Sequence, residues 1–195
     1  MKIFKNVRQW FFNLMHGIKD RIDDLISGIK WHLSSYLFCR GKYHVTITRP
    51  GVGVIYDEDV PNGITDEGLN HILGVEFHGD TQITTWYIGI VDNASFSAFA
   101  AADVMNSHAG WIEVTAYSES VRQTWPTDAS SARSISNAVA ATFSINAGKT
   151  LKGIFVTSDS TKSGTTGKLW STAAFASTVA VISGDSVKVT YTVSG

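Results

Sequence analysis

The sequence predicts a mainly β protein, in which a long amphipathic N-terminal α-helix precedes an antiparallel β-sandwich or jelly-roll-like domain. Three observations support this fold class. Hydrophobic residues recur at every third or fourth position over residues 1–38, as they do in an amphipathic helix. After Gly41 the period changes to two, the period of a strand. Short strand-like segments then follow one another with almost no helix between them, which is typical of a sandwich.

The N-terminal helix has one hydrophobic stripe. The stripe consists of Phe4, Val7, Phe11, Leu14, Ile18, Ile22, Leu25, Ile29 and Leu33. A lone helix with such a stripe is unstable in water, so we expect the stripe to bind a partner. Docking on another protein or on a second copy fits the sustained three-and-four spacing best. Packing on the sandwich and binding to a lipid surface are the alternatives, and the acidic Asp20, Asp23 and Asp24 argue against lipid.

The chain is therefore expected to have two parts, an anchoring or oligomerisation segment at residues 1–40 and a sandwich at residues 41–195. Their charges differ: residues 1–42 hold eight basic and three acidic residues, a net charge of +5, and the other 153 residues carry −6. The whole chain has a net charge of −1, which provides no overall basic field for nucleic acid.

The amino-acid composition further limits the kind of protein that this chain can be. The 195 residues are 44% hydrophobic, enough for a core, and 17% charged, below the ~25% of ordinary soluble domains. Cys39 is the one cysteine, so no disulfide forms within the chain. The N-terminus lacks the pattern of a secretory signal, and its longest early apolar run, Trp10–Phe12, is far short of a membrane span.

Within the second part, a hairpin is expected at residues 43–48 and 52–56, with its turn at Pro50-Gly51. Thr65 is a good N-cap, and Asp66 and Glu67 complement the dipole of a short helix at 66–73.

Seven strands are expected after this helix, and residues 95–109 are expected to form an Ala-rich loop. The strands span 82–91, 112–117, 138–146, 151–157, 169–175, 178–182 and 186–193. The alternation places Val187, Val189, Tyr191 and Val193 in the core, and likewise Val139, Ala141, Phe143 and Ile145. Segment 82–91 is apolar on both faces, as a central strand is.

Three groups of residues superficially suggest a chemical site. Gly164-Thr165-Thr166-Gly167-Lys168 lacks the first glycine and the final Ser or Thr of a phosphate-binding loop, so we interpret it as a hairpin turn. His71, Glu76, His78 and Asp80 could ligate a divalent ion, but their spacing matches no metal motif. Asp103, Ser107 and His108 lack the context of a catalytic triad, and Asp103 and His108 are expected to cap or brace a loop. Cys39 is interpreted as a small packing residue. We therefore predict no enzymatic activity, no cofactor and no metal.

From about Thr65 to the C-terminus the chain resembles a family of small virion structural proteins encoded by tailed bacteriophages. The resemblance rests on Thr65-Asp66-Glu67-Gly68-Leu69-Asn70-His71, His78-Gly79, Thr85-Trp86-Tyr87-Ile88-Gly89, Ser107-His108-Ala109-Gly110-Trp111, Ala116-Tyr117, Arg122 and Ser160-Thr161-Lys162-Ser163-Gly164-Thr165-Thr166-Gly167.

The resemblance implies a structural role in the virion after synthesis in the host cytoplasm. The preferred role is capsid decoration, that of a cement protein bound to the major capsid protein or other virion proteins and assembled as a homo-oligomer. A tail or head fibre component that contacts the host surface is the alternative. A carbohydrate-binding module is a third possibility, with Trp86, Trp111, Trp125 and Trp170 as candidate stacking platforms.

Overall fold

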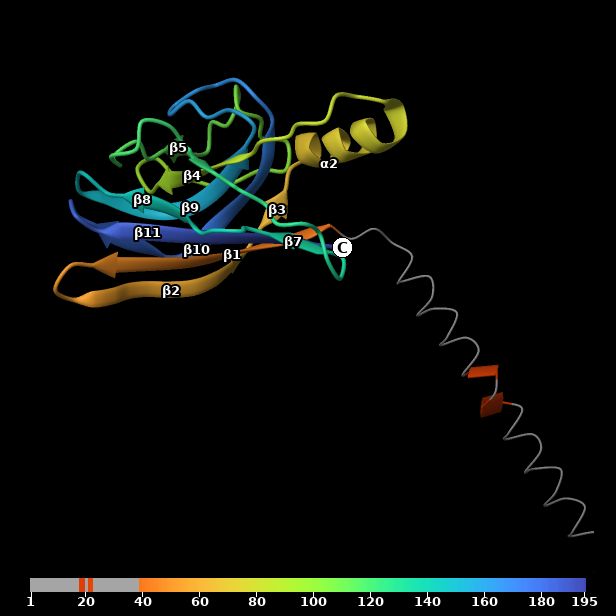
Figure 1. Cartoon of the computed structure of the whole chain (residues 1–195), viewed down its shortest axis with the longest axis horizontal. Helices are drawn as coiled ribbons and strands as arrows, with labels where there is room; N and C mark the ends of the chain where they lie inside the picture. Colours follow the sequence, from red (N-terminus) through yellow and green to blue (C-terminus); the bar gives the residue numbers. More distant parts are fainter. Residues whose placement is uncertain (1–17, 20, 23–38) are drawn as a thin grey trace, which may run out of the picture. The chain divides into compact units, whose positions relative to one another are not determined.

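Two antiparallel sheets pack face to face and form a β-sandwich-like fold (Figure 1). The structure is a computed structural model that describes residues 18, 19, 21, 22 and 39–195. The sandwich lies within one compact unit, Cys39–Gly195. The predicted mainly β, antiparallel fold is confirmed.

The first sheet has the order β2-β1-β11, with two short strands that pair one after the other along the other edge of β11. Its members are β1 (Arg40–Arg49), β2 (Gly53–Pro61), β7 (Ser134–Ser136), β8 (Ala141–Ser144) and β11 (Ser186–Ser194). β1 and β2 form the predicted hairpin, and β1 pairs with β11 from Arg40 opposite Ser194 to Thr48 opposite Ser186. The first and last strands of the sandwich are thus hydrogen-bonded neighbours.

The second sheet has the order β3-β10-β9-β4, with two short strands on the far edge of β4. Its members are β3 (Gly63–Ile64), β4 (Tyr87–Asp92), β5 (Ile112–Glu113), β6 (Gln123–Thr124), β9 (Lys149–Thr157) and β10 (Leu169–Val181). β4 pairs with β9 on one side and with β5 and β6 on the other, so the predicted central strand is confirmed over this range.

The main core lies between the sheets and is built by alternation. Val187, Val189 and Tyr191 of β11 point into it, together with Ile154 and Val156 of β9. Side chains between these positions on β9 point the other way. Phe155 enters a second cluster with Met105 and Trp111, beneath the loop that follows β4. Because this loop covers the outer face of the second sheet, its central strands are apolar on both faces.

The short helix is confirmed at its predicted bounds. α2 spans Asp66–Leu73, and a π-helical turn, η1, continues it over Gly74–His78. Gly79 ends η1 with a left-handed backbone, φ 78°, a conformation that costs glycine little. α2 lies at one end of the sandwich (Figure 1).

Segment 138–146 corrects one prediction. Pairing starts only at Ala141, and Val139 is exposed rather than buried. Asn137 provides the physical reason: its side chain accepts a hydrogen bond from the Tyr191 amide and donates one to the Val189 carbonyl. Between β7 and β8 the Asn137 side chain thus takes the place of backbone hydrogen bonds to β11, and Val139, in the bend that follows, is exposed.

Other strand boundaries also differ from the prediction. Residues 82–86 lie outside the sheet, and only Ile112–Glu113 of segment 112–117 form a strand. The two strands predicted at 169–175 and 178–182 are one, β10, in which a bulge breaks the register between Ala174 and Val179. Three strands of two or three residues, β3, β6 and β7, were not predicted, because such short strands carry no detectable period.

The long N-terminal helix is largely outside the described residues. Ile18, Lys19, Arg21 and Ile22 are described and have α-helical conformation. Of the predicted stripe, Phe4, Val7, Phe11, Leu14, Leu25, Ile29 and Leu33 lie outside the described residues.

Candidate docking surface

The N-terminal end of α2 is fixed to the start of β10. The Thr65 hydroxyl caps the helix by accepting from the Gly68 amide at 3.0 Å, and it donates to the Leu169 carbonyl. The Thr65 amide donates to the Trp170 carbonyl at 3.0 Å, and the Glu67 carboxylate accepts from the Leu169 amide at 2.8 Å. The N-cap read from the sequence therefore also anchors the helix to the sheet.

Gly68 allows the helix to approach the sheet closely. A Cβ atom at this position would lie 2.7 Å from the Trp170 carbonyl oxygen and 2.9 Å from the indole ring. One turn later, the buried His71 meets the edge of Trp86, with ring centroids 5.8 Å apart. Burial and, to a smaller extent, the charge of Lys168 lower the pKa of His71. His71 is therefore a neutral packing residue at pH 7.

A largely apolar groove of about 440 Å³ runs between α2–η1 and the end of the sandwich. Trp86, Trp125 and Trp170 line it, with Ile72 and Val75 of the helix and Ile83 of the unpaired segment before β4. Cys39, the residue before β1, also lines the groove. Burial raises the pKa of its thiol, which is consistent with Cys39 as a packing residue.

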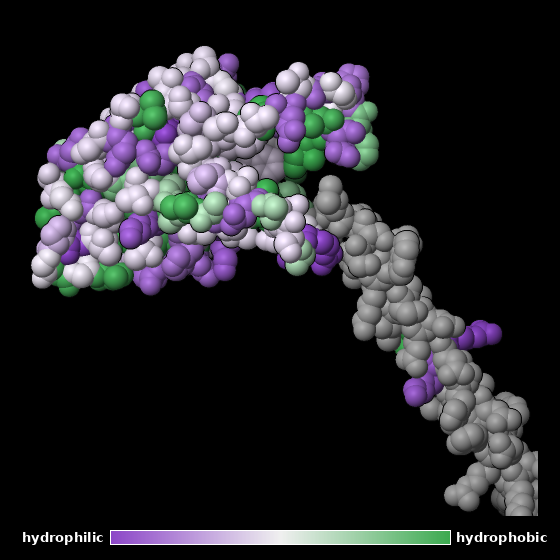
Figure 2. All heavy atoms as spheres, viewed as in Figure 1, coloured by the Kyte–Doolittle hydropathy of each residue, from purple (hydrophilic) through white to green (hydrophobic). Residues whose placement is uncertain are grey.

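The solvent side of α2–η1 carries a hydrophobic ridge, made of Leu69, Leu73 and Phe77. Their spacing of four places them on one flank, next to the flank of Ile72 and Glu76 that faces the groove. Their exposed fractions are 41%, 50% and 78%. Hydrophobic residues gather over α2 in Figure 2. Ridge and groove together form one apolar surface, which we call the α2 surface.

The α2 surface lies in the most acidic stretch of the chain. Residues 50–121 contain eleven Asp or Glu residues and no Lys or Arg, and the fold pairs four of these acids with basic residues from elsewhere in the chain. Glu76 lines the groove, is exposed, and forms no salt bridge with any residue that the structure describes. An unpaired carboxylate beside an apolar groove favours a partner that is both apolar and basic.

Asp103 and His108, two of the residues considered for a catalytic triad, form contacts within the protein. Asp103 accepts hydrogen bonds from the Trp111 indole at 3.0 Å and from the Ala100 amide at 3.0 Å. His108 stacks on the Trp111 ring at 3.9 Å between centroids. These contacts confirm that Asp103 and His108 brace the loop after β4. The described residues form no group of three His, Cys, Asp or Glu side chains able to hold a metal ion.

Segment 164–168 lies in the loop between β9 and β10, as the hairpin interpretation predicts. A buried Arg122 organises this loop: it donates to the carbonyls of Asp159 and Gly164 at 2.8 and 3.0 Å. Its other donors form a two-pronged pair with the buried Glu113 carboxylate, at 2.9 and 2.8 Å. The loop is thus held from inside, and none of Arg122's charge is available to a ligand.

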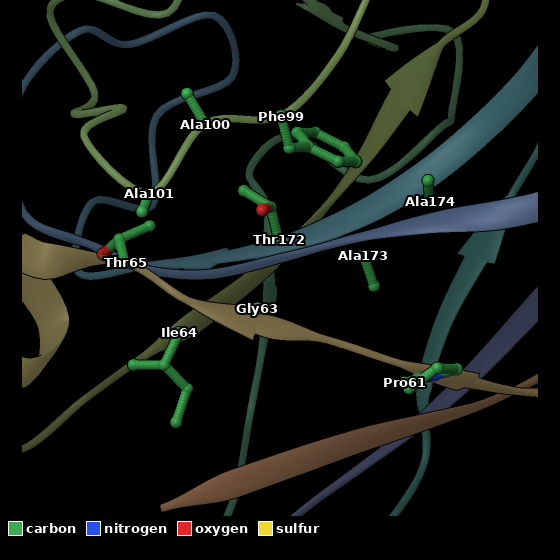
Figure 3. Close-up of a pocket in the computed structure, with 10 residues that line it drawn as sticks. All are labelled: Pro61, Gly63, Ile64, Thr65, Phe99, Ala100, Ala101, Thr172, Ala173 and Ala174. Carbon is green, nitrogen blue, oxygen red and sulfur yellow. The ribbon is translucent and has the colours of Figure 1, made fainter.

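A smaller pocket of about 230 Å³ lies where β3 meets β10 (Figure 3). Its lining consists mainly of small side chains, among them Ala100, Ala101, Ala173 and Ala174, and none of its lining residues is charged. Its two hydroxyls belong to Thr65, which is engaged in capping α2, and to Thr172.

The structure places the four candidate tryptophans in or beside the core. Trp111, Trp125 and Trp170 are buried, and Trp86 is half-buried against Trp170. A sugar-stacking platform needs an open ring face, and the exposed fractions of Trp111, Trp125 and Trp170 are only 1%, 8% and 7%. Of the predicted stripe, Ile18 and Ile22 are described, and their exposed fractions are 45% and 48%.

Sequence reasoning missed the α2 surface, although a signal was present. The predicted helix and the five residues after it carry two apolar sets, Leu69, Leu73 and Phe77 beside Ile72 and Val75. One set packs against the sandwich, and the other remains exposed. An apolar arc wider than one packing face indicates a second contact.

Neither a protein-family model nor a curated protein sequence matches the chain. The resemblance to phage virion proteins therefore stays a prediction. Among the described residues, every helix is too short or too polar to cross a membrane.

Proposed function

We propose that this protein is a non-enzymatic structural protein of a tailed-phage virion, and that it decorates the capsid as a cement protein. It is made in the host cytoplasm and binds to the major capsid protein or to other virion proteins. The proposal rests on the sequence resemblance and on what the residues that carry it do in the fold. Thr65, Glu67 and Gly68 fix α2, and Arg122 holds the β9–β10 loop. These residues therefore stabilise the fold.

One observation carries the proposal: the surface features of the chain suit protein contact better than chemistry. The α2 surface presents exposed Leu69, Leu73 and Phe77 beside a tryptophan-lined groove. The residues that suggested a triad are engaged in bracing contacts, as described above. An exposed apolar surface on a domain with few charges is typical of a protein that assembles with others.

The predicted N-terminal stripe adds a second contact element. Fully burying one Leu, Ile or Phe side chain contributes roughly 1.5–3 kcal/mol. Even partial burial of the nine stripe residues would hold a small protein on a particle. A sandwich with an exposed apolar surface and an apolar N-terminal segment can contact a shell subunit and a neighbouring copy at the same time, and such linkage of subunits is the task of a cement protein.

The test is to locate the protein on virions of the phage that encodes it. Antibody–gold labelling of intact, purified particles is expected to mark the head surface at many sites. Heads that lack the protein are expected to release DNA at a lower temperature and to recover when the purified protein is added. Labelling of the tail alone would favour the fibre alternative, and particles without any label would refute the virion role.

A further inference from the structure

We infer that the α2 surface is the binding site for the N-terminal segment of a second copy of this chain. This segment, residues 1–38, is called the arm. The inference goes beyond the proposed virion role and does not depend on it. It states which segment binds the α2 surface and which surface the apolar stripe contacts.

The first argument is the match in shape and hydrophobicity. The predicted stripe repeats every three or four residues along one helix face. The ridge of Leu69, Leu73 and Phe77 repeats every four, and the groove runs beside it. Ridges and grooves with these spacings are the elements by which two helices pack. The described stripe residues, Ile18 and Ile22, are exposed in the same way as the ridge.

The second argument is charge. Residues 1–38, the proposed occupant, hold six basic and three acidic residues, a net charge of +3, whereas residues 39–195 have a net charge of −4. Glu76 lines the groove and forms no salt bridge with any described residue. A basic amphipathic helix would supply apolar side chains and cations together, which favours this occupant over an acidic or neutral one.

The third argument is where the segment joins the sandwich. Cys39, the residue that follows the segment, lines the groove. Two copies that lie with their grooves adjacent would therefore bring the attachment point of each segment next to the groove of the other copy. Reciprocal exchange of the two arms closes a dimer, whereas exchange in one direction produces rings or chains.

The test uses three full-length variants. The arm variant is Leu14→Ser/Ile18→Ser/Ile22→Ser, and the surface variant is Leu69→Ser/Leu73→Ser/Phe77→Ser. The matched control, Val52→Ser/Val54→Ser/Val139→Ser, removes three exposed apolar side chains elsewhere on the sandwich. Circular dichroism first verifies that each variant is folded, and sedimentation velocity then measures association over a range of protein concentrations.

The parent and the control are expected to associate with equal affinity. The arm and surface variants are each expected to associate about 100-fold or more weakly, because each loses three apolar side chains from the same contact. A mixture of the two is expected to associate again, since one still has an intact arm and the other an intact surface. Association of the parent is also expected to weaken as salt is raised.

Four outcomes would overturn the inference. They are a monomeric parent at every concentration, a surface variant that associates like the parent, a control that loses association equally, and a mixture that stays monomeric. A parent that is monomeric but sediments with anionic phospholipid vesicles would show that lipid is the target of the arm.

Discussion

Arg122 is a long cationic side chain that is almost fully buried, and its hydrogen bonds to Glu113, Asp159 and Gly164 all lie within the fold. Its partner Glu113 is also buried and accepts a further hydrogen bond from the Ser163 amide at 2.7 Å. Removal of one member of a buried pair leaves the other charge without compensation. The stability of the β9–β10 loop therefore depends on this one arginine.

We predict that Arg122→Met lowers the free energy of unfolding by about 3–5 kcal/mol, the usual cost of stranding a buried charge. Urea denaturation measures the loss, and hydrogen exchange of the amides between 159 and 165 should accelerate. Lys188→Met, at an exposed position of β11, is the control and should change stability by less than about 0.5 kcal/mol. Equal stability of the two variants would mean that Arg122 is not the brace.

His71 offers a test by pH. Its pKa is lowered in the folded protein from the ordinary value of 6.5, chiefly by burial. Above pH 6.5 the imidazole is neutral in both the folded and the unfolded chain. As the pH falls through 6.5, the unfolded chain binds a proton that the folded chain does not, so the free energy of unfolding decreases until the lowered folded pKa is reached.

We therefore predict that the parent loses more stability between pH 7.5 and pH 5 than His71→Phe, which retains an aromatic ring against Trp86. Chemical denaturation at the two pH values measures both losses, and the other histidines contribute equally to each protein. Identical pH dependence in the two proteins would contradict the assignment of His71 as a neutral packing residue.

At the scale of the elements, α2 owes its position to a glycine inside a helix. In an isolated helix, replacement of glycine by alanine stabilises by about 1 kcal/mol. At Gly68 the new Cβ would meet the backbone oxygen of Trp170. That oxygen belongs to a strand and cannot move without disturbing the sheet, so the clash outweighs the gain in helix propensity.

We predict that Gly68→Ala destabilises the protein by about 1–3 kcal/mol, the cost of overpacking, and changes the near-ultraviolet circular dichroism of the tryptophans in the groove. Gly63→Ala is the matched control, because nothing lies within 4 Å of its added Cβ. Its stability should stay within about 0.5 kcal/mol of the parent. A stabilised Gly68→Ala protein would show that the helix does not need this close approach.

At the scale of the whole molecule, the structure assigns the described core to Cys39–Gly195. Both hydrophobic clusters lie within this range, and β1 begins at Arg40, opposite Ser194 of the last strand. We predict that a fragment of residues 39–195 unfolds cooperatively, with a midpoint close to that of the full chain at low protein concentration. Thermal circular dichroism checks this. A fragment without a cooperative transition would mean that residues 1–38 are needed for folding.

The elements that the sequence predicted well are those set by local physical chemistry. The bounds of α2 follow from the Thr65 cap, the two acidic residues after it and the short apolar period. The inward face of β11 follows from strict alternation over eight residues. Such signals lie within a few positions of the residues that they control, so they can be read without knowledge of any partner strand.

The elements that were missed depend on contacts between distant parts of the chain. Val139 turns outward because Asn137 bonds to Tyr191, which is 54 positions away in the sequence. Ile83 and Trp86 are apolar because they line a groove rather than because they belong to a sheet. The pattern of hydrophobic residues is the same in both cases, so the period alone cannot distinguish them.

By itself, the sequence determined that this protein is mainly β, that a capped helix interrupts the strands, and that a basic apolar-striped segment precedes a more acidic domain. Only the tertiary structure decided which strands are neighbours, that β10 is one bulged strand, and that α2–η1 leaves a ridge and a groove exposed. The physical reason is the range of the interactions. Caps, turns and alternation act between residues close in sequence, whereas grooves and buried charge pairs arise where the fold brings distant residues into contact.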